Sequence, residues 1–331
     1  MMLDVDIRLE QGEFRLNARF VAPDGITVVF GPSGSGKSTL LAAIAGLRRC
    51  RGRIYLGPRT LADCAARLHV SPHQRGIGMV FQDARLFPHL TVRQNIDYAR
   101  RRAEVARRRE VDEVAGFFDI VALLDRPVGN LSGGEESRVA LARAIVAAPD
   151  FLLLDEPFAA LDGARRRSFI RTLLDMHGTY GLPMLVVTHD IDDAAALGTH
   201  LVALRDGEVA ESGPFVEASR TPAFGALLDS RDVGTAVPAQ ALRRAHDGGG
   251  RAVWLRADHV LLAGEAPRAI SARNVLAGEV CTVQPDDGGN LLVGVRTEAG
   301  SILSRITPEA ADELHIAPGL KIWALVKAHA L

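Results

Sequence analysis

The chain has 331 residues, of which 47% are hydrophobic and 24% are charged, so it can bury a full core and is long enough for two domains. The formal net charge of -1 excludes a strong overall field for nucleic acid, and the three cysteines form no CxxC pair, which argues against a zinc site or disulfide framework. The charged N-terminus does not predict a signal peptide, and no apolar run reaches the roughly 18 residues that a membrane-spanning helix needs.

The first predicted elements lead to a glycine-rich loop. Leu3–Leu9 and Phe14–Phe20 alternate apolar and polar residues around a Gln-Gly pair, which predicts a β-hairpin. Ile26–Phe30 is a short apolar run typical of a strand buried on both faces, and Ser38–Leu47 has apolar residues at helical spacing. The loop Gly31–Ser38 therefore joins a buried strand to a helix.

Helices and apolar strands alternate further along the chain. Arg93–Leu124 is largely helical in pattern, and Glu135–Ala148 is a second helix that ends before a proline. The apolar strands Phe151–Leu154 and Met184–Val187 follow, and a strand pair is turned by Asp206-Gly207. This alternation predicts an α/β fold over residues 1–228, with a mainly parallel core sheet and a helical subdomain at about 88–148.

The C-terminal third of the chain has a different pattern. Residues 229–270 are weakly patterned, and we interpret them as a linker and a shortened connecting segment. From Ser271 to Leu331, short alternating strands surround one helix at Pro308–Leu314, which is the pattern of a small OB-like β-barrel. Its predicted strands are Asn274–Val283, Leu291–Arg296, Ser301–Ile306 and Lys321–Lys327.

The sequence GPSGSGKS at Gly31–Ser38 matches the pattern GxxxxGK[ST]. Glycines let backbone N–H groups surround phosphate oxygens, and the next helix adds the positive end of its dipole. Lys37 is expected to reach the β- and γ-phosphates, and the Ser38 hydroxyl to bind Mg²⁺. A flexible Gly/Ser turn is the simpler alternative, but the strand–loop–helix context favours a nucleotide site. The residues of this site are Gly31, Pro32, Ser33, Gly34, Ser35, Gly36, Lys37, Ser38 and Thr39.

Two carboxylates, Asp155 and Glu156, follow the apolar strand Phe151–Leu154. Asp155 suits a Mg²⁺ site, and Glu156 suits a general base for an attacking water. Such a pair can also simply begin a loop, and it is the phosphate loop upstream that favours the catalytic interpretation.

The stretch LSGGE at Leu131–Glu135 begins the helix that runs to about Ala148. Ser132 and Glu135 form a capping box, which is the structural explanation for both residues. A capping box does not explain Gly133 and Gly134, which weaken a first helical turn but leave the backbone amides open to an anion. We therefore predict a second phosphate-binding helix N-terminus.

Gln82 and His189, each placed after an apolar strand, are individually more typical of surface residues. In order, however, the phosphate loop, Gln82, LSGGE, LLLDE, Leu161-Asp162 and His189 resemble the ATPase domains of ABC transporters over about residues 1–228. The resemblance implies a head-to-tail homodimer that encloses two ATP molecules. Each ATP would touch one subunit's phosphate loop and the other subunit's Ser132–Glu135, and Asp162 would bridge the subunits.

The same resemblance implies roles for single residues. Glu156 would polarise water, His189 would contact the γ-phosphate, and Gln82 would link Mg²⁺ to the membrane partner. The nearest candidate for stacking on adenine is Phe14, with packing inside the hairpin as the alternative. Glu135 stands where glutamine is commoner, but both side chains complete a capping box, so no loss of activity is expected.

Two stretches resemble molybdate importer ATPases in particular. Phe81–Val92 contains DARLFPH, and Ser271–Leu276 (SARNVL) is similar to the opening of molybdate-binding Mop domains, also called TOBE domains. The chain is shorter than that family at about 230–270. Hydroxyls, amides and cations suit a tetrahedral dianion, although the barrel could instead only dimerise. The candidate molybdate ligands are Ser271, Arg273, Asn274, Ser304 and Lys327.

The resemblance thus implies a subunit that uses ATP and Mg²⁺ to power molybdate import from the cytoplasmic face of the inner membrane. Its partners would be a second copy, two integral membrane permease subunits and, indirectly, an extracytoplasmic molybdate-binding protein, with no nucleic acid. The alternatives are another cargo (tungstate, sulfate, iron or polyamine), a soluble ABC ATPase, or an oxyanion storage or sensor protein. The runs Arg100–Arg102 and Arg107–Arg109 are expected to be solvated helix faces.

Overall fold

The computed structural model describes residues 1–104, 107–159, 161–242, 251–268, 270–286 and 288–326. By its internal contacts the chain divides into two compact units. The first comprises Met1–His189 and His200–Ser212, and the second comprises Asp190–Thr199 and Gly213–Leu331. The domain boundaries at 228 and 271 remain predictions from sequence pattern.

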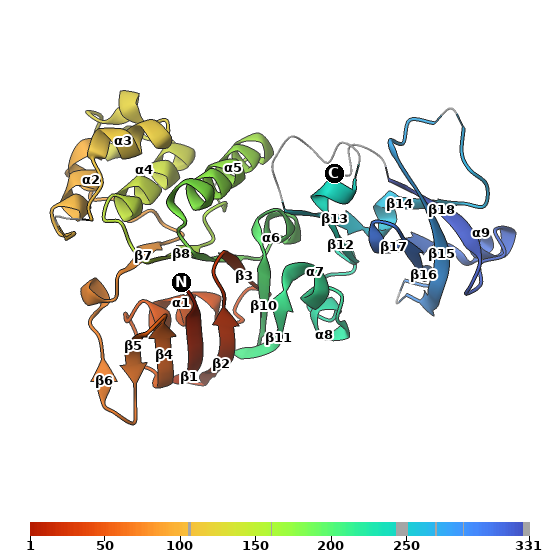
Figure 1. The fold of residues 1–331 in the computed structure, drawn as a ribbon, viewed down its shortest axis with the longest axis horizontal. Coiled ribbons are helices and arrows are strands. Elements are labelled where there is room, and N and C mark those ends of the chain that lie inside the picture. The colour runs from red at the N-terminus through yellow and green to blue at the C-terminus, as the bar shows by residue number, and fades with distance from the viewer. Residues whose placement is uncertain (105–106, 160, 243–250, 269, 287, 327–331) are drawn as a thin grey trace. The chain divides into compact units, whose positions relative to one another are not determined.

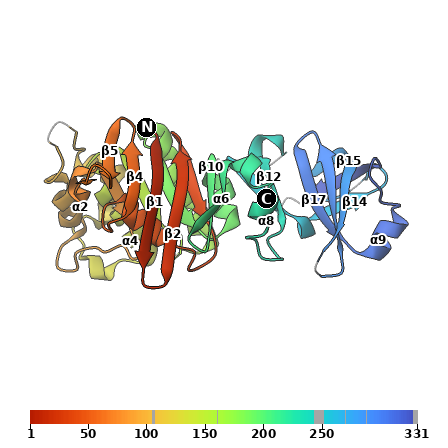
Figure 2. The same ribbon diagram turned by 90° about the horizontal axis from the view of Figure 1, so that it is seen from below.

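The first unit is built on one mixed sheet with the strand order β6-β5-β4-β1-β2-β11-β10-β3-β9-β8-β7 (Figures 1 and 2). The strands are β1 Leu3–Gln11, β2 Phe14–Ala22, β3 Ile26–Phe30, β4 Arg51–Leu56, β5 Arg59–Asp63, β6 Leu68–His69, β7 Ile77–Val80, β8 Phe151–Asp155, β9 Met184–Thr188, β10 His200–Arg205 and β11 Glu208–Pro214. The predicted α/β fold is confirmed.

The parallel half of this sheet forms the core of the unit. Strands β7, β8, β9, β3 and β10 pair in parallel. Every residue of β3, β8 and β9 is buried, as expected for apolar strands that are covered on both faces. Because parallel strands end at the same edge, this half brings the ends of β3, β8 and β9 together.

In the other half, β1, β2, β4, β5 and β6 pair antiparallel and begin with the predicted hairpin, while β11 pairs with β2 in parallel. Strands β1 and β2 pair from Leu3 opposite Ala22 to Gln11 opposite Phe14. Gly12 has φ +60° in the turn, a left-handed conformation that glycine adopts without strain. The inward residues of both strands are buried and the outward ones exposed, which is the alternation that predicted the hairpin.

Helices follow the strands of the first unit. They are α1 Lys37–Ile44, α2 Val92–Arg100, α3 Val111–Phe117, α4 Gly133–Ile145 and α5 Gly163–Tyr180. Helices α2, α3 and α4 contact one another and lie together in Figure 1, with α4 packed on the edge strand β7. The predicted helical stretch after Arg93 is therefore interrupted, because α2 ends at Arg100 and α3 begins only at Val111.

The second unit contains a five-stranded antiparallel sheet with the order β14-β18-β15-β16-β17. Its elements are α6 Ile191–Leu197, α7 Phe215–Ala218, α8 Pro222–Gly225, β12 Gly234–Pro238, β13 Ala252–Arg256, β14 Val260–Ala263, β15 Asn274–Pro285, β16 Leu291–Thr297, β17 Gly300–Ile306, α9 Pro308–Glu313 and β18 Lys321–Val326. The predicted strands and helix after residue 271 are confirmed. The segment before them supplies β12 and β13, which pair and pack on β17.

Candidate nucleotide-binding site

The glycine-rich loop runs from the end of β3 to the start of α1, as predicted. Gly36 precedes α1 with φ +103°, which a residue with a side chain adopts only under strain. A Cβ on Gly31 would lie 2.1 Å from the carbonyl oxygen of Leu204, so only glycine fits there. Glycine at these two positions therefore allows the tight loop conformation that leads directly into the N-terminus of α1, where a phosphate would bind.

The ammonium group of Lys37 lies inside this loop. Only 6% of Lys37 is exposed, and its Nζ donates to the carbonyl oxygens of Gly31 at 2.7 Å and Pro32 at 2.8 Å. Burial lowers the pKa of the Lys37 ammonium, while the nearby carboxylates of Glu156 and Asp155 act in the opposite direction. The cation is thus placed where phosphate oxygens would compete with two neutral carbonyls for it.

Ser38 and Asp155 meet beside the loop. The Ser38 hydroxyl donates to Oδ1 of Asp155 at 3.1 Å, although the two residues are 117 positions apart. Asp155 ends β8 and is 6% exposed, and burial raises the pKa of its carboxyl group above the usual range. A hydroxyl and a desolvated carboxylate side by side fit Mg²⁺, because a divalent cation would offset the cost of burying that charge.

Glu156 and His189 lie at the ends of the neighbouring strands β8 and β9. Nδ1 of His189 is 2.7 Å from Oε2 of Glu156. The backbone of Glu156 has φ +47°, and its N–H donates to the carbonyl of Val187 at 3.1 Å. A left-handed non-glycine residue costs on the order of 1–3 kcal/mol and persists where its surroundings hold it, which is common at functional sites.

A cleft of about 370 Å³ brings most of these residues together. Its lining residues are Gln11, Phe14, Ser33, Gly34, Gly36, Lys37, Ser38, Thr39 and Glu156. Phe14 lies directly on the loop, since a Cβ on Gly36 would be 2.6 Å from its ring. Gln11 was not predicted to be at this site, and only its place opposite Phe14 at the end of β1 could have indicated it.

The predicted second phosphate-binding element lies outside this cleft. Ser132 caps α4, and its N–H and hydroxyl both donate to Oε2 of Glu135, at 2.7 and 2.8 Å. These bonds from Ser132 hold the pKa of the Glu135 carboxyl below its usual range. Ser132 and Gly133 are exposed, and none of Ser132–Glu135 lines the cleft at the phosphate loop.

Two further predicted residues also lie apart from the cleft lining. Asp162 caps α5 by accepting from the N–H of Arg165 at 3.0 Å, a role that its position before a helix could have indicated. Gln82 is exposed two residues after the end of β7. Their proposed contacts would need a second subunit or a bound nucleotide.

A larger groove of about 820 Å³ lies next to Gln82. Its lining includes the aromatic side chains of Phe81, Phe87 and Tyr98, together with five arginines and the carboxylates of Glu104 and Asp150. Asp150 pairs with both Arg59 and Arg107. The groove is therefore aromatic and carries a surplus of positive charge.

The arginine runs in the helical subdomain are mostly engaged within the chain. Arg100 pairs with Glu110 at 2.5 Å, and Arg101 pairs with Asp97 at 2.6 Å. The guanidinium groups of Arg102 and Arg109 lie over the rings of Tyr98 at 3.5 Å and Tyr180 at 3.8 Å. Ion pairs and stacking thus account for most of these charges.

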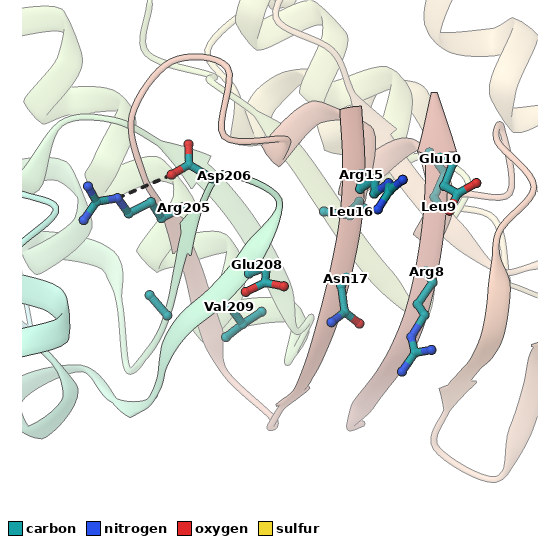
Figure 3. Close-up of a pocket in the computed structure, with 11 residues that line it drawn as sticks. Arg8, Leu9, Glu10, Arg15, Leu16, Asn17, Arg205, Asp206, Glu208 and Val209 are labelled. Atoms are coloured by element: carbon teal, nitrogen blue, oxygen red, sulfur yellow. Dashed lines mark ion pairs between the residues drawn. The ribbon is translucent and has the colours of Figure 1, made fainter. Parts of the chain in front are cut away.

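A separate cleft of about 540 Å³ crosses β1, β2 and the β10–β11 turn (Figure 3). None of the predicted site residues lines it. Its charged lining residues are Arg8, Glu10, Arg15, Arg205, Asp206 and Glu208. Three cations balance three anions, and Arg205 and Asp206 pair at 3.6 Å, so the cleft favours neither sign of ligand.

In the second unit, the candidate oxyanion ligands differ in accessibility. Asn274 is 2% exposed, and its Nδ2 has no hydrogen-bond partner within the described residues. Ser304 is fully buried and donates to the carbonyl of Val260 at 2.6 Å, whereas Ser271 and Arg273 are exposed. Lys327 lies outside the described residues.

Two kinds of feature are absent from the described part of the chain. No group of three or more His, Cys, Asp or Glu side chains there is arranged to hold a metal ion. Within the same residues, no helix combines the length and apolarity required to cross a bilayer.

A phosphate loop with strand-end carboxylates beside it defines a P-loop ATPase site, and the remote LSGGE helix start is typical of the ABC class. A family model described as ABC transporter matches residues 19–159, and one described as TOBE domain matches residues 270–331. Among solved structures, cbiO1 from Clostridium perfringens, part of an ABC transporter complex, is 25% identical with a TM-score of 0.54 and covers 65% of this chain and 89% of its own. An ATP-binding cassette solved as a dimer with ADP and Pi is 27% identical with a TM-score of 0.54, covering 65% of this chain and 99% of its own.

Relatives that match along nearly their whole length identify the particular family within the ABC class. The molybdenum import ATP-binding protein ModC of Rhodospirillum rubrum is 36% identical, covering 100% of this chain and 97% of its own. The protein of the same name from Rhizobium meliloti is 38% identical, covering 100% of this chain and 99% of its own. The chain therefore belongs to the ModC family of ABC transporter ATP-binding proteins.

Proposed function

We propose that this chain hydrolyses ATP to power the import of molybdate through an ABC transporter. The proposed hydrolysis is supported chiefly by the position of Glu156, which lines the same cleft as Lys37 and Ser38 and contacts His189. The cargo is supported by full-length relatives that are named for molybdenum import.

Each side chain of the cleft has a distinct task in this proposal. Lys37 exchanges its two carbonyl partners for phosphate oxygens, and the amides of the loop bind the same phosphates. Ser38 and Asp155, together with Gln82, would hold Mg²⁺, which would supply positive charge against the phosphates when bound. Glu156 accepts a proton from the attacking water, while His189 orients the Glu156 carboxylate and reaches the γ-phosphate.

A second copy of the chain would complete the site. Ser132–Glu135 form an exposed helix start whose amides can bind phosphate, yet none of them lines the cleft beside Lys37. A head-to-tail homodimer places the Ser132 end of one copy on the phosphate loop of the other, with Asp162 at the junction. The dimeric ATP-binding cassette solved with ADP and Pi supports this arrangement.

The groove beside Gln82 is the proposed docking site for the membrane permease. It is lined by aromatic side chains and excess arginine, and Arg85 and Phe87 are the residues of segment 82–88 that line it. Two copies would bind two integral membrane permease subunits at the cytoplasmic face of the inner membrane. An extracytoplasmic molybdate-binding protein would deliver the cargo to them.

The sheet of the second unit is the proposed oxyanion site. Asn274 supports this because its buried amide has a donor without a partner in the described chain, and Arg273 next to it supplies an exposed cation. Ser271 could add a hydroxyl, whereas the proton of Ser304 is directed to Val260. Lys327 retains its proposed role from the sequence alone.

Uptake in a deletion strain tests the proposed function. The chain and its permease are restored in cells that lack both, and labelled molybdate, tungstate and sulfate are supplied separately. We expect uptake of molybdate with the wild-type chain and no uptake with Glu156→Gln. Uptake of sulfate but not molybdate would contradict the proposed cargo, and unchanged uptake with Glu156→Gln would contradict the proposed chemistry.

A further inference from the structure

Arg143 connects helix α4 to the loop that follows Gln82. Its Nη1 donates to the carbonyl of Arg85 at 2.8 Å, and its Nη2 donates to the carbonyl of Ala84 at 2.9 Å. The guanidinium also faces the ring of Phe87, 5.7 Å from the ring centroid. The planar guanidinium of Arg143 therefore donates to two successive carbonyls, a geometry that a lysine ammonium does not reproduce.

The rest of this loop is held by α2. The side chain of Asn95 accepts from the N–H of Phe87 at 2.8 Å and donates to its carbonyl at 3.2 Å. The ring of Phe87 lies 4.5 Å from that of Tyr98. Both anchors, Arg143 and Asn95, belong to the helical subdomain, so the loop is fixed to that subdomain and not only to strand β7.

The backbone of this loop is under strain that these bonds can hold. Arg85 has φ +47°, a left-handed conformation that costs a non-glycine residue on the order of 1–3 kcal/mol. The carbonyl of this same residue accepts from Arg143. Two charge-assisted hydrogen bonds are strong enough to select such a conformation.

Helix α4 carries the connection to the other end of the subdomain. It begins at Gly133, directly after Ser132, and includes Arg143 in its last turn. A helix of 13 residues spans roughly 20 Å and is stiff along its axis. A single continuous helix thus joins the residue that holds Ala84 and Arg85 to the Ser132 end of the subdomain.

We propose that Arg143 is a positioning residue that couples the permease groove to the Ser132 end of α4. The inference rests on the proposed function, in which the permease occupies the groove and Ser132 meets ATP in the partner copy. Arg143 also lines the groove, but in this role it acts through the carbonyls of Ala84 and Arg85 that it holds and not by contact with ATP. It makes segment 84–87 and α4 move as one body, so that loss of its two bonds uncouples permease binding from hydrolysis.

The test uses Arg143→Met, which keeps much of the apolar stem but removes both donors, in the complete transporter in lipid vesicles. We expect ATPase activity of the isolated subunit to fall less than threefold, and permease-dependent ATPase activity and molybdate uptake to fall tenfold or more. Arg143→Lys should recover part of the coupling. Arg101→Met is the matched control, because Arg101 is an exposed arginine on the same subdomain, paired with Asp97.

A structural role alone would give a different result. If Arg143 only stabilised the fold, the ATPase activities of the isolated subunit and of the transporter would fall by the same factor, together with the melting temperature. Either that outcome or unchanged coupling overturns the inference. Amide exchange of segment 84–88 gives a second readout, since Arg143→Met should raise it while leaving the β1–β2 hairpin unchanged. Failure of the wild-type transporter to take up molybdate would instead reject the proposed function.

Discussion

The imidazole of His189 lies against the carboxylate of Glu156, with Nδ1 2.7 Å from Oε2. The contact exists because β8 and β9 are parallel neighbours, with Asp155 in register with Val187. Each strand ends at the same edge, and the residue just beyond each end carries a functional group. Glu156 is 18% exposed and His189 is 59% exposed, so water can reach the pair.

Replacing Glu156 by glutamine should remove the general base while preserving shape. We expect the rate of hydrolysis to fall by about 10²- to 10³-fold, because general-base catalysis contributes on that order. ATP binding should persist, since Lys37 and Ser38 are untouched. Single-turnover hydrolysis and nucleotide binding measure the two effects separately. Glu113→Gln on α3 is the control, and more than a tenth of wild-type turnover in Glu156→Gln would contradict the assignment.

Phe14→Ala tests whether the ring that lies on Gly36 stacks on adenine. Stacking is worth about 1–3 kcal/mol per base, so the Kd for ATP should rise about 5- to 160-fold. The affinity for inorganic triphosphate should change much less, because it has no base. Phe14→Trp should restore ATP binding. Equal losses for ATP and triphosphate would mean that Phe14 only supports the loop.

Ser132→Ala removes one helix cap at the proposed shared site. Loss of a cap costs about 1 kcal/mol, so the melting temperature should fall by a few degrees. Hydrolysis should fall far more than this stability loss explains, while ATP binding to the isolated subunit remains. Thr307→Ala is the matched control, because Thr307 caps α9 by accepting from the N–H of Ala310. Equal activity in the two variants would argue against a phosphate contact at Ser132.

Arg75 is fully buried and ties the end of α1 to the segment before β7. Its Nη1 donates to the carbonyls of Ala43 at 3.2 Å and Ile44 at 2.6 Å, and its Nε donates to that of Val70 at 2.9 Å. Arg75→Ala leaves these buried carbonyls without a donor, so the free energy of unfolding should fall by about 3 kcal/mol. Chemical denaturation measures it, with the exposed Arg51→Ala as a control that should change by less than about 0.5 kcal/mol.

Calorimetry of the full chain tests the proposed oxyanion site. Molybdate and tungstate should release heat, whereas sulfate should bind more weakly. Arg273→Ala and Asn274→Ala should each reduce the affinity by about tenfold, since a hydrogen bond to a charged group is worth about 1.5–3 kcal/mol. Arg296→Ala is a control on the same sheet. Absence of heat with every oxyanion would leave the second unit without a ligand role.

The sequence predicted those features that are encoded locally. The pattern GPSGSGKS predicts a loop whose glycines permit its backbone conformation. The apolar run before Asp155 predicts a buried strand without reference to the strands beside it. The capping box at Ser132 is likewise local, and the structure confirms both of its hydrogen bonds.

Features that depend on distant contacts could not be predicted in this way. Arg75 looks like a surface residue in the sequence, because only the folded chain reveals the helix end that it serves. Arg143 is one of two arginines on α4, and its partners at Ala84 and Arg85 are nearly 60 positions away. The weakly patterned segment after residue 229 supplies β12 and β13, whose pairing depends on packing against β17.

The most direct test of the central claim is simultaneous measurement of ATP hydrolysis and labelled molybdate uptake by the purified transporter in lipid vesicles. We expect uptake that requires ATP and Mg²⁺, exceeds sulfate uptake, and falls together with hydrolysis by about 10²- to 10³-fold in Glu156→Gln. More than a tenth of wild-type hydrolysis in Glu156→Gln, or hydrolysis by the wild-type transporter without any accumulation of molybdate, would contradict this prediction.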